Sequence, residues 1–290
     1  MKKFYCRVLV PSTGKYEYFR EINFSETKNI SKFIQNNDLK GLSVFLQDLV
    51  DKNGYDKNII YNILDYLFIL CQLRGYSYGS TVTFNTKNEN GSPFSFKHNV
   101  QRLLTYENLL QKDFKKTIYD NKIEVNLDLP KKLQFLNESD IISRNIESMC
   151  IDSQKISFSE LKNNEKEMIL NSLTANFSNK ILDYIREVTE FLSQFSFFET
   201  INSKNFENIT LNPYNNSFIE YLKTIFSYDL MGLYEIEYLL IRKLKFSLTD
   251  LKNISLNEAE LHLNLYKKEL KAMEDANNKS GVANRGVSDN

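Results

Sequence analysis

The residues whose chemistry could serve a metal site or a proton transfer are few in this sequence. Histidine occurs only at His98 and His262. Neither lies near a cysteine, or near a second histidine at the spacing that zinc ligands use. We therefore interpret both as surface or packing residues, and the sequence predicts no catalytic histidine and no metal site.

Three cysteines, Cys6, Cys71 and Cys150, are spread along the chain, and none belongs to a Cys-x-x-Cys pair. No hydrophobic signal segment follows Met1, so the simplest interpretation is reduced thiols in a protein made in a cytoplasm. The longest apolar run, residues 59–73, is interrupted by polar residues and is too short to span a bilayer. We expect a soluble protein with no membrane partner.

Phosphate binding commonly uses a glycine-rich loop, and two segments share parts of that composition. Residues 12–15 read Ser-Thr-Gly-Lys, but the first glycine and the Gly-Lys-Ser/Thr order are missing. Gly75 and Gly79 flank Tyr-Ser-Tyr without forming a dinucleotide fingerprint. A hairpin turn and a helix-to-strand turn account for both segments, so we expect no cofactor and no small-molecule ligand.

Carboxylates can perform acid–base catalysis when two of them converge on one bond. Nearby pairs occur at three places: Glu235 with Glu237, Glu258 with Glu260, and Glu124 with Asp128. Residues two apart on a helix point to different faces, which excludes convergence of the first two pairs. Glu124 and Asp128 can share a strand face, but no neighbouring lysine completes a nuclease-like set. The sequence predicts no catalytic residue; an enzyme would need a fold that brings Glu124, Asp128 and a lysine into one cleft.

Lysines plus arginines number 37, as do aspartates plus glutamates, so the formal net charge is zero. A neutral chain has no overall field that attracts nucleic acid, which argues against a general DNA-binding role. Basic residues do cluster with aromatic residues at 112–116, 130–135 and 242–246. Solvated helix ends explain these clusters; the alternative is a nucleic-acid or host-interaction module that uses residues 112–116 and 242–245.

In the first half of the chain, both strands and helices are expected to position these residues. The pattern predicts them in this order: strands at residues 4–10 and 16–20, helices between 25 and 50, a central buried helix at 59–73, and strands at 81–84 and 122–129. A small N-terminal antiparallel sheet wrapped by helices is the simplest fold for residues 1–137.

In the second half of the chain the hydrophobic pattern predicts helices almost throughout. The expected fold class is therefore α+β and predominantly helical. We expect an α+β scaffold domain at residues 1–137 and a helical domain at residues 138–273. Residues 274–290 are polar and contain glycine, and we expect them to form a disordered tail.

The last predicted helix carries an apolar stripe at alternating steps of three and four residues. Its members are Leu256, Ala259, Leu263, Tyr266, Leu270 and Met273. Together with the apolar segment 230–240, the stripe provides more apolar helical surface than one short domain readily covers. It packs either on the chain's own core or in the groove of a partner, and it is the candidate partner interface.

Two stretches of the first half have a distinctive order of residues. The first holds Val10-Pro11-Ser12-Thr13-Gly14-Lys15, then Phe19-Arg20 and Glu26. The second holds Tyr66, Leu67, Phe68, Arg74, Ser77 and Gly79. Both are similar to sequences of the baseplate hub and hub-assembly proteins of T4-like contractile-tailed phages, although the interval from Phe68 to Arg74 is longer here.

This resemblance implies a non-enzymatic part in building the tail baseplate, as a hub subunit or as an assembly chaperone. Its implied partners are other phage tail and baseplate proteins, and nucleic acid is not expected. The implied location is the host cytoplasm during assembly, and the baseplate of the virion for a subunit that stays in the particle. The family brings no catalytic residue. Some relatives carry a Cys-containing knuckle after the strand, but residues 85–96 of this chain contain no cysteine, so no metal is inferred. Arg20 and Arg74 are expected to anchor the fold through hydrogen bonds.

Overall fold

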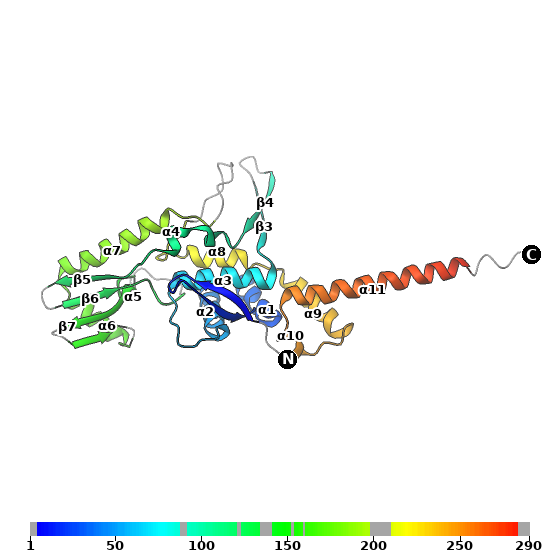
Figure 1. The fold of residues 1–290 in the computed structure, drawn as a ribbon, viewed down its shortest axis with the longest axis horizontal. Coiled ribbons are helices and arrows are strands. Elements are labelled where there is room, and N and C mark those ends of the chain that lie inside the picture. The colour runs from blue at the N-terminus through cyan, green and yellow to red at the C-terminus, as the bar shows by residue number, and fades with distance from the viewer. Residues whose placement is uncertain are drawn as a thin grey trace, which may run out of the picture.

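The computed structural model describes residues 5–87, 92–120, 123–133, 141–151, 154–158, 160–197 and 210–283 of the 290-residue chain. The described part is an α+β fold in which helices predominate and the strands form small antiparallel sheets. This confirms the fold class that the sequence predicts. Figure 1 shows an elongated molecule with a sheet-containing lobe at one end, a helical body in the middle and a projecting last helix at the other end.

The N-terminal hairpin consists of β1 (Tyr5–Val10) and β2 (Lys15–Arg20), which pair antiparallel. Gly14 in the turn has a φ of 63°, a conformation that residues with a Cβ rarely adopt. One face of the hairpin is buried in the core through Cys6, Val8, Val10 and Phe19. The predicted strand–turn–strand opening is confirmed.

Helix α3 (Ile63–Tyr78) covers one edge of this hairpin and is itself buried around most of its circumference. Gln72 satisfies both backbone groups of Leu9, because its Oε1 accepts from the Leu9 N–H and its Nε2 donates to the Leu9 carbonyl, each at 2.9 Å. The central helix is confirmed, but it begins at Ile63 and not at residue 59. Asn62 and Asp65 form a capping box that fixes this start.

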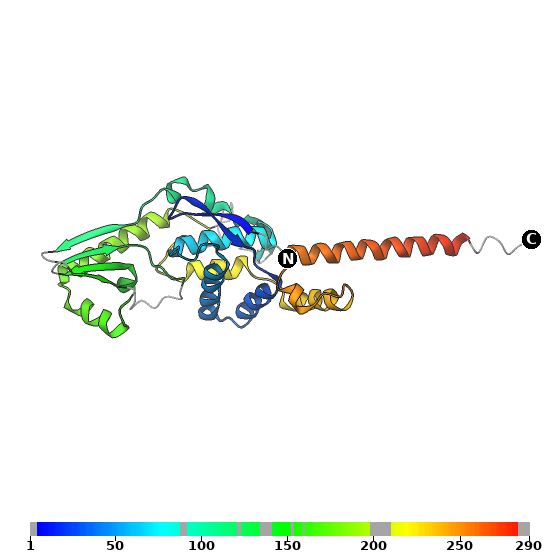
Figure 2. The same cartoon turned by 60° about the horizontal axis from the view of Figure 1, so that its bottom comes forward.

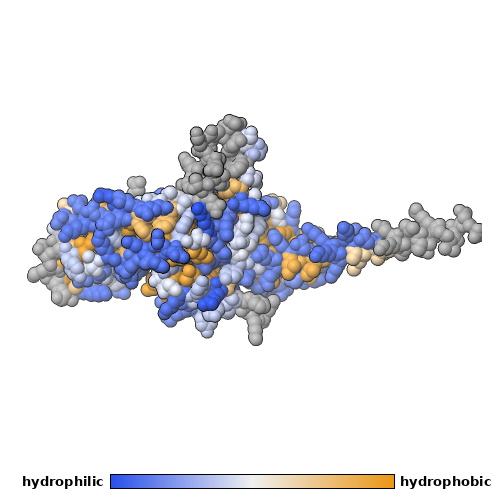
Figure 3. Space-filling model, turned by 45° about the horizontal axis from the view of Figure 1, so that its top comes forward, coloured by the Kyte–Doolittle hydropathy of each residue, from blue (hydrophilic) through white to orange (hydrophobic). Residues whose placement is uncertain are grey.

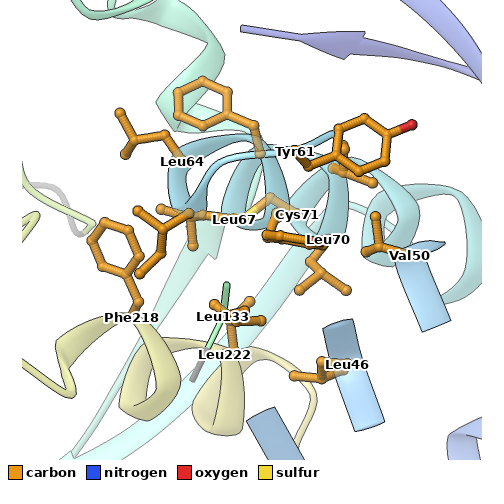
Figure 4. Packing of buried hydrophobic residues seen from close by; sticks show 14 of the residues in the cluster. Leu46, Val50, Tyr61, Leu64, Leu67, Leu70, Cys71, Leu133, Phe218 and Leu222 are labelled. Atoms are coloured by element: carbon orange, nitrogen blue, oxygen red, sulfur yellow. The ribbon is translucent and has the colours of Figure 1, made fainter. Parts of the chain in front are cut away.

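The remaining helices of the body come from both ends of the chain. Helix α1 (Phe24–Gln35) packs on α2 (Leu39–Asn53), and α2 packs on α3. Far later in the sequence, α8 (Ser217–Ile225) packs on α2 and α3, and α9 (Leu230–Arg242) packs on α1. Figure 4 shows Phe218 and Leu222 of α8 in one hydrophobic cluster with Leu67 and Leu70 of α3.

A second hairpin follows α3 and leads away from the body. It consists of β3 (Thr81–Lys87) and β4 (Pro93–Asn99), and the predicted strand at 81–84 forms its beginning. A single 3₁₀ turn (Arg102–Thr105) and the short helix α4 (Glu107–Leu110) then connect it to the sheet-containing lobe. The chain therefore crosses from the body to this lobe near residue 110 (Figure 1).

The lobe is built on a four-stranded antiparallel sheet. Its strands follow in the order β5 (Lys116–Asp120), β6 (Ile123–Leu127), β7 (Ile146–Ile151) and β8 (Gln154–Ser157). Helix α7 (Ala175–Ser193) packs on β5, and the lobe also contains α5 (Ile141–Asn145) and α6 (Asn163–Ser172). Figure 2 shows this lobe at the opposite end of the molecule from the projecting helix.

Two features differ from what the sequence predicts for the second half. Strands β7 and β8 lie in a region expected to be helical, so the boundary expected at residue 137 separates two neighbouring strands of one sheet. Pairing of Met149 with Val125, both fully buried, holds β7 in that sheet. The last helix, α11 (Leu256–Ala283), also continues past Met273 into the segment expected to be a disordered tail, of which residues 284–290 lie outside the described residues.

Candidate partner interface on the C-terminal helix

The first half of the apolar stripe on α11 belongs to the chain's own core. Ser255 and Glu258 cap the helix start: the Ser255 N–H donates to Glu258 Oε2 at 2.8 Å, and the Glu258 N–H donates to Ser255 Oγ at 3.4 Å. Leu256, Ala259 and Leu263 are buried there, where α11 packs against α9, α1 and α3. These three side chains are occupied within the molecule.

The second half of the stripe leaves the body. Tyr266 is half-buried, whereas Leu270 is 40% exposed and Met273 is 61% exposed. Leu261 and Leu265, on neighbouring faces of the same helix, are also exposed. Figures 1 and 2 show that α11 extends away from the other elements over this length. One continuous stripe therefore begins in the core and ends in solvent.

Helix α9 adds an apolar face beside the base of α11. Met231, Tyr234 and Tyr238 are exposed and border a shallow hollow of about 400 Å³. Lys28 of α1 borders this face, because its Nζ lies 2.5 Å from Glu237 Oε2 and 4.4 Å from the Tyr234 ring centroid. Figure 3 shows hydrophobic surface near the base of the projecting helix.

A second exposed surface lies on the outer face of the N-terminal hairpin. Tyr5, Tyr16 and Tyr18 are exposed there, the Arg7 guanidinium lies 4.3 Å from the Tyr16 ring centroid, and Tyr55 packs edge-on to Tyr5. Tyrosine and arginine are the residues that protein interfaces favour. Sequence reasoning missed this surface, although the alternation of Tyr5 and Arg7 opposite the buried residues of β1 was a usable signal.

Arg20 and Arg74 anchor the fold as the sequence predicts. The Arg20 guanidinium donates to Glu26 Oε1 at 2.6 Å, to Asn53 Oδ1 at 2.5 Å and to the Glu21 carbonyl at 2.7 Å. Arg74 is buried, and it donates to the carbonyls of Ile225, Tyr78 and Gly79. Every one of these acceptors belongs to the chain itself, so both arginines have structural roles.

The two histidines lie in unrelated surroundings. His98 is buried, its Nε2 lies 2.8 Å from the Tyr221 hydroxyl, and burial lowers its pKa from 6.5 to about 4. His262 is exposed and packs its ring on Phe246, with centroids 5.1 Å apart. His98 therefore packs in the interior, and His262 lies at the surface. Among the described residues, no group of three or more His, Cys, Asp and Glu side chains could hold a metal ion.

Glu124 is not among the described residues that line the two cavities bordered by Asp128. Glu124 accepts a hydrogen bond from Asn126 at 3.1 Å, whereas Asp128 lines a cavity together with Glu147 and Lys131. That second carboxylate comes from β7, a strand that the sequence pattern missed. In these two cavities, Asp128 therefore lies with Glu147 and Lys131 and not with Glu124.

The basic clusters also separate in space. Residues 112–115 and 131–132 line the neighbouring cavities of the lobe, whereas residues 242–246 begin at the last residue of α9 in the body. Lys116 forms an ion pair with Glu187 at 2.7 Å, and the Lys112 Nζ lies 5.1 Å from the Phe191 ring centroid. The two patches of the nucleic-acid alternative, 112–116 and 242–245, thus lie on different parts of the fold.

Comparison with known proteins gives one match. Residues 1–197 match the model of a family described as T4 bacteriophage base plate protein. No curated protein and no solved structure matches the chain. The match covers the N-terminal hairpin, α3 and the sheet-containing lobe.

None of the described helices has the length and apolar character needed to cross a membrane.

Proposed function

Because the chain belongs to the T4 bacteriophage base plate protein family, we propose that it acts in baseplate assembly without catalysing a reaction. Its role is that of a hub subunit or of a hub-assembly chaperone. It binds other tail proteins in the host cytoplasm while the tail is built. The family membership supports the baseplate, and the surfaces of the molecule support action through protein contacts.

The observation that carries this proposal is the division of the α11 stripe at Tyr266. Residues before it fix the helix to the body through Leu256, Ala259 and Leu263, which are buried. Residues after it, Leu270 and Met273, present apolar side chains on a helix that extends into solvent. A helix anchored at one end and apolar at the other suits insertion into a groove of a partner.

The charges beside the stripe favour a different protein over a second copy of this chain. In a parallel coiled coil of two copies, residues five apart on the flanking positions face each other. Glu269 would then face Glu274, and His262 would face Lys267. The first pair is repulsive and the second gains nothing, which favours a heterologous tail protein over a parallel dimer of this chain.

Quantitative mass spectrometry of purified virions and of infected-cell lysate tests the proposal. A fixed copy number per virion identifies a built-in hub subunit. Abundance in lysate with loss from virions, together with association with tail intermediates, identifies an assembly chaperone. Failure to associate with any tail component in either sample would contradict the proposed function.

A further inference from the structure

Two adjoining cavities open in the lobe, where it meets the turn of the N-terminal hairpin. The first has a volume of about 710 Å³ and lies between residues 11–14, residues 109–115 and the start of α3. The second has a volume of about 810 Å³ and lies along β7, β8 and α6. Ile60, Asp128, Lys131 and Glu147 line both cavities, so we treat them as one cleft.

This cleft concentrates positive charge, although the chain as a whole has a formal net charge of zero. Its cationic residues are Lys112, Lys115, Lys131, Lys132, Arg144, Lys155 and Lys166. Its anionic residues are Asp113, Asp128, Glu147 and Glu160. We call it the basic cleft. The cations come from segments far apart in the sequence, so only the fold brings them together.

Glu147 lies at the centre of the basic cleft. Lys131 forms an ion pair with it, and Lys115 and Lys155 help Lys131 hold the pKa of this carboxyl below its usual range. Asp128 also interacts with Lys131 and Lys115, so two carboxylates face three ammonium groups and leave an excess of positive charge. In the described part of the chain, Lys115, Lys132 and Lys155 have no ion-pair partner. Three cations of the cleft are therefore available to a ligand.

We propose that the basic cleft binds an acidic segment of another tail protein. This inference rests on the proposed role in protein contacts and adds a second contact site, remote from α11. Carboxylates of the segment pair with Lys115, Lys132 and Lys155. A local excess of positive charge attracts such a segment and orients it, even though the whole chain is neutral.

The lining of the basic cleft favours a polypeptide over nucleic acid. Asp128 and Glu147 lie where the two cavities adjoin, and they would repel a phosphate backbone that carries a charge on every nucleotide. A polypeptide can place N–H donors at those carboxylates and acidic side chains at the lysines. Ile60 also lines both cavities and is 72% exposed, which offers an apolar contact amid the charges. The matching ligand is an acidic segment with one apolar side chain.

Fluorescence anisotropy with the full-length chain tests this inference. The probe is a fluorescein-labelled peptide of about ten residues in which three glutamates alternate with uncharged residues around one central leucine. The test variant is Lys115→Glu/Lys132→Glu/Lys155→Glu. The control is Lys40→Glu/Lys243→Glu/Lys252→Glu, three exposed lysines outside the cleft, with the same change of net charge. Circular dichroism checks that both variants are folded.

The expected result is binding that weakens as salt rises, a loss of affinity of about tenfold or more in the cleft variant, and a change of less than about twofold in the control. Ile60→Ser should weaken binding of this peptide but not of a peptide with serine in place of leucine. Equal binding by the cleft variant and the control would overturn the inference. So would tighter binding of a thymidine decanucleotide than of the peptide, because the cleft would then be a nucleic-acid site.

This outcome is separable from the proposed function. If the peptide does not bind but tail proteins still associate with the chain in infected cells, only the acidic-segment inference fails. If no tail protein associates, the proposed function fails whatever the peptide does.

Discussion

Arg74 of α3 donates a hydrogen bond from Nε to the backbone carbonyl of Ile225 at the end of α8, at 3.1 Å. Arg74 lies within the stretch that matches the baseplate family, residues 1–197, and Ile225 lies beyond it. The same guanidinium donates to the carbonyls of Tyr78 and Gly79, where α3 ends. One buried cation therefore joins the family-matched part of the chain to its C-terminal helices.

Replacing Arg74 with alanine should destabilise the whole body. The change removes charge-assisted hydrogen bonds to three carbonyls and leaves those acceptors buried, at a cost of about 3 kcal/mol or more in the free energy of unfolding. Urea denaturation followed by circular dichroism measures this. Arg186→Ala is the control, since Arg186 forms an exposed pair with Asp183, and its loss should cost less than about 0.5 kcal/mol. Equal effects of the two variants would contradict the anchoring role.

The two halves of the α11 stripe should respond differently to the same substitution. Leu263→Asp places a charge in the core and should cost about 3 kcal/mol or more, whereas Leu270→Asp changes a side chain that is 40% exposed and should alter stability by less than about 0.5 kcal/mol. Thermal or urea denaturation of both variants checks this. Unfolding of the Leu270→Asp protein would show that the end of the stripe is core as well.

The sequence predicted the stripe but could not predict where it leaves the core. Periodicity places Leu256 and Met273 on one face of a helix, and nothing in that pattern says where the neighbouring helices end. The point where the stripe leaves the core depends on the packing of α9 and α1 beside α11. These contacts join distant parts of the chain. The hairpin turn and the central helix were predictable because their signals, Gly14 and the apolar run after Asn62, are local.

The lobe was harder to predict for the same reason. Strand β7 is a short segment, Ile146–Ile151, which becomes a strand because it pairs with β6 across an intervening stretch of chain. Missing it also hid the basic cleft, since Glu147 lies on β7 and Lys155 on β8. The lysines of 112–116 and 130–135 were visible as clusters, but their convergence is a product of the sheet.

His98 should make the protein less stable in acid. Burial lowers its pKa to about 4 from 6.5, so below pH 6.5 the unfolded chain binds a proton that the folded chain does not. The contribution of His98 to the free energy of unfolding is therefore complete above pH 6.5. As the pH falls towards 4, the free energy of unfolding decreases by about 3 kcal/mol. Urea denaturation across this range should show a smaller decline in His98→Gln than in the wild type. An equal decline of the free energy of unfolding in His98→Gln and in the wild type would contradict this prediction. His262→Gln serves as the control.

The three cysteines should differ sharply in reactivity. Cys6 and Cys71 are buried, and burial raises the pKa of each thiol to about 12, so almost none of either is thiolate near pH 8. Cys150 is partly exposed. Iodoacetamide should modify Cys150 alone in the native protein and all three after unfolding, as read by mass spectrometry. A Cys150→Ser protein that is still labelled rapidly in its native state would show that the body opens more than this packing allows.

The most direct test of the central claim is affinity purification of the chain from phage-infected cells, followed by quantification of the tail proteins that it captures. Wild type is compared with Leu270→Asp/Met273→Asp, and Lys271→Asp is the control on the same exposed length of α11. The account predicts that tail proteins accompany the wild type and the control, and that capture falls about tenfold in the double variant, which keeps its fold. Undiminished capture by the double variant, or no tail protein with the wild type, would contradict it.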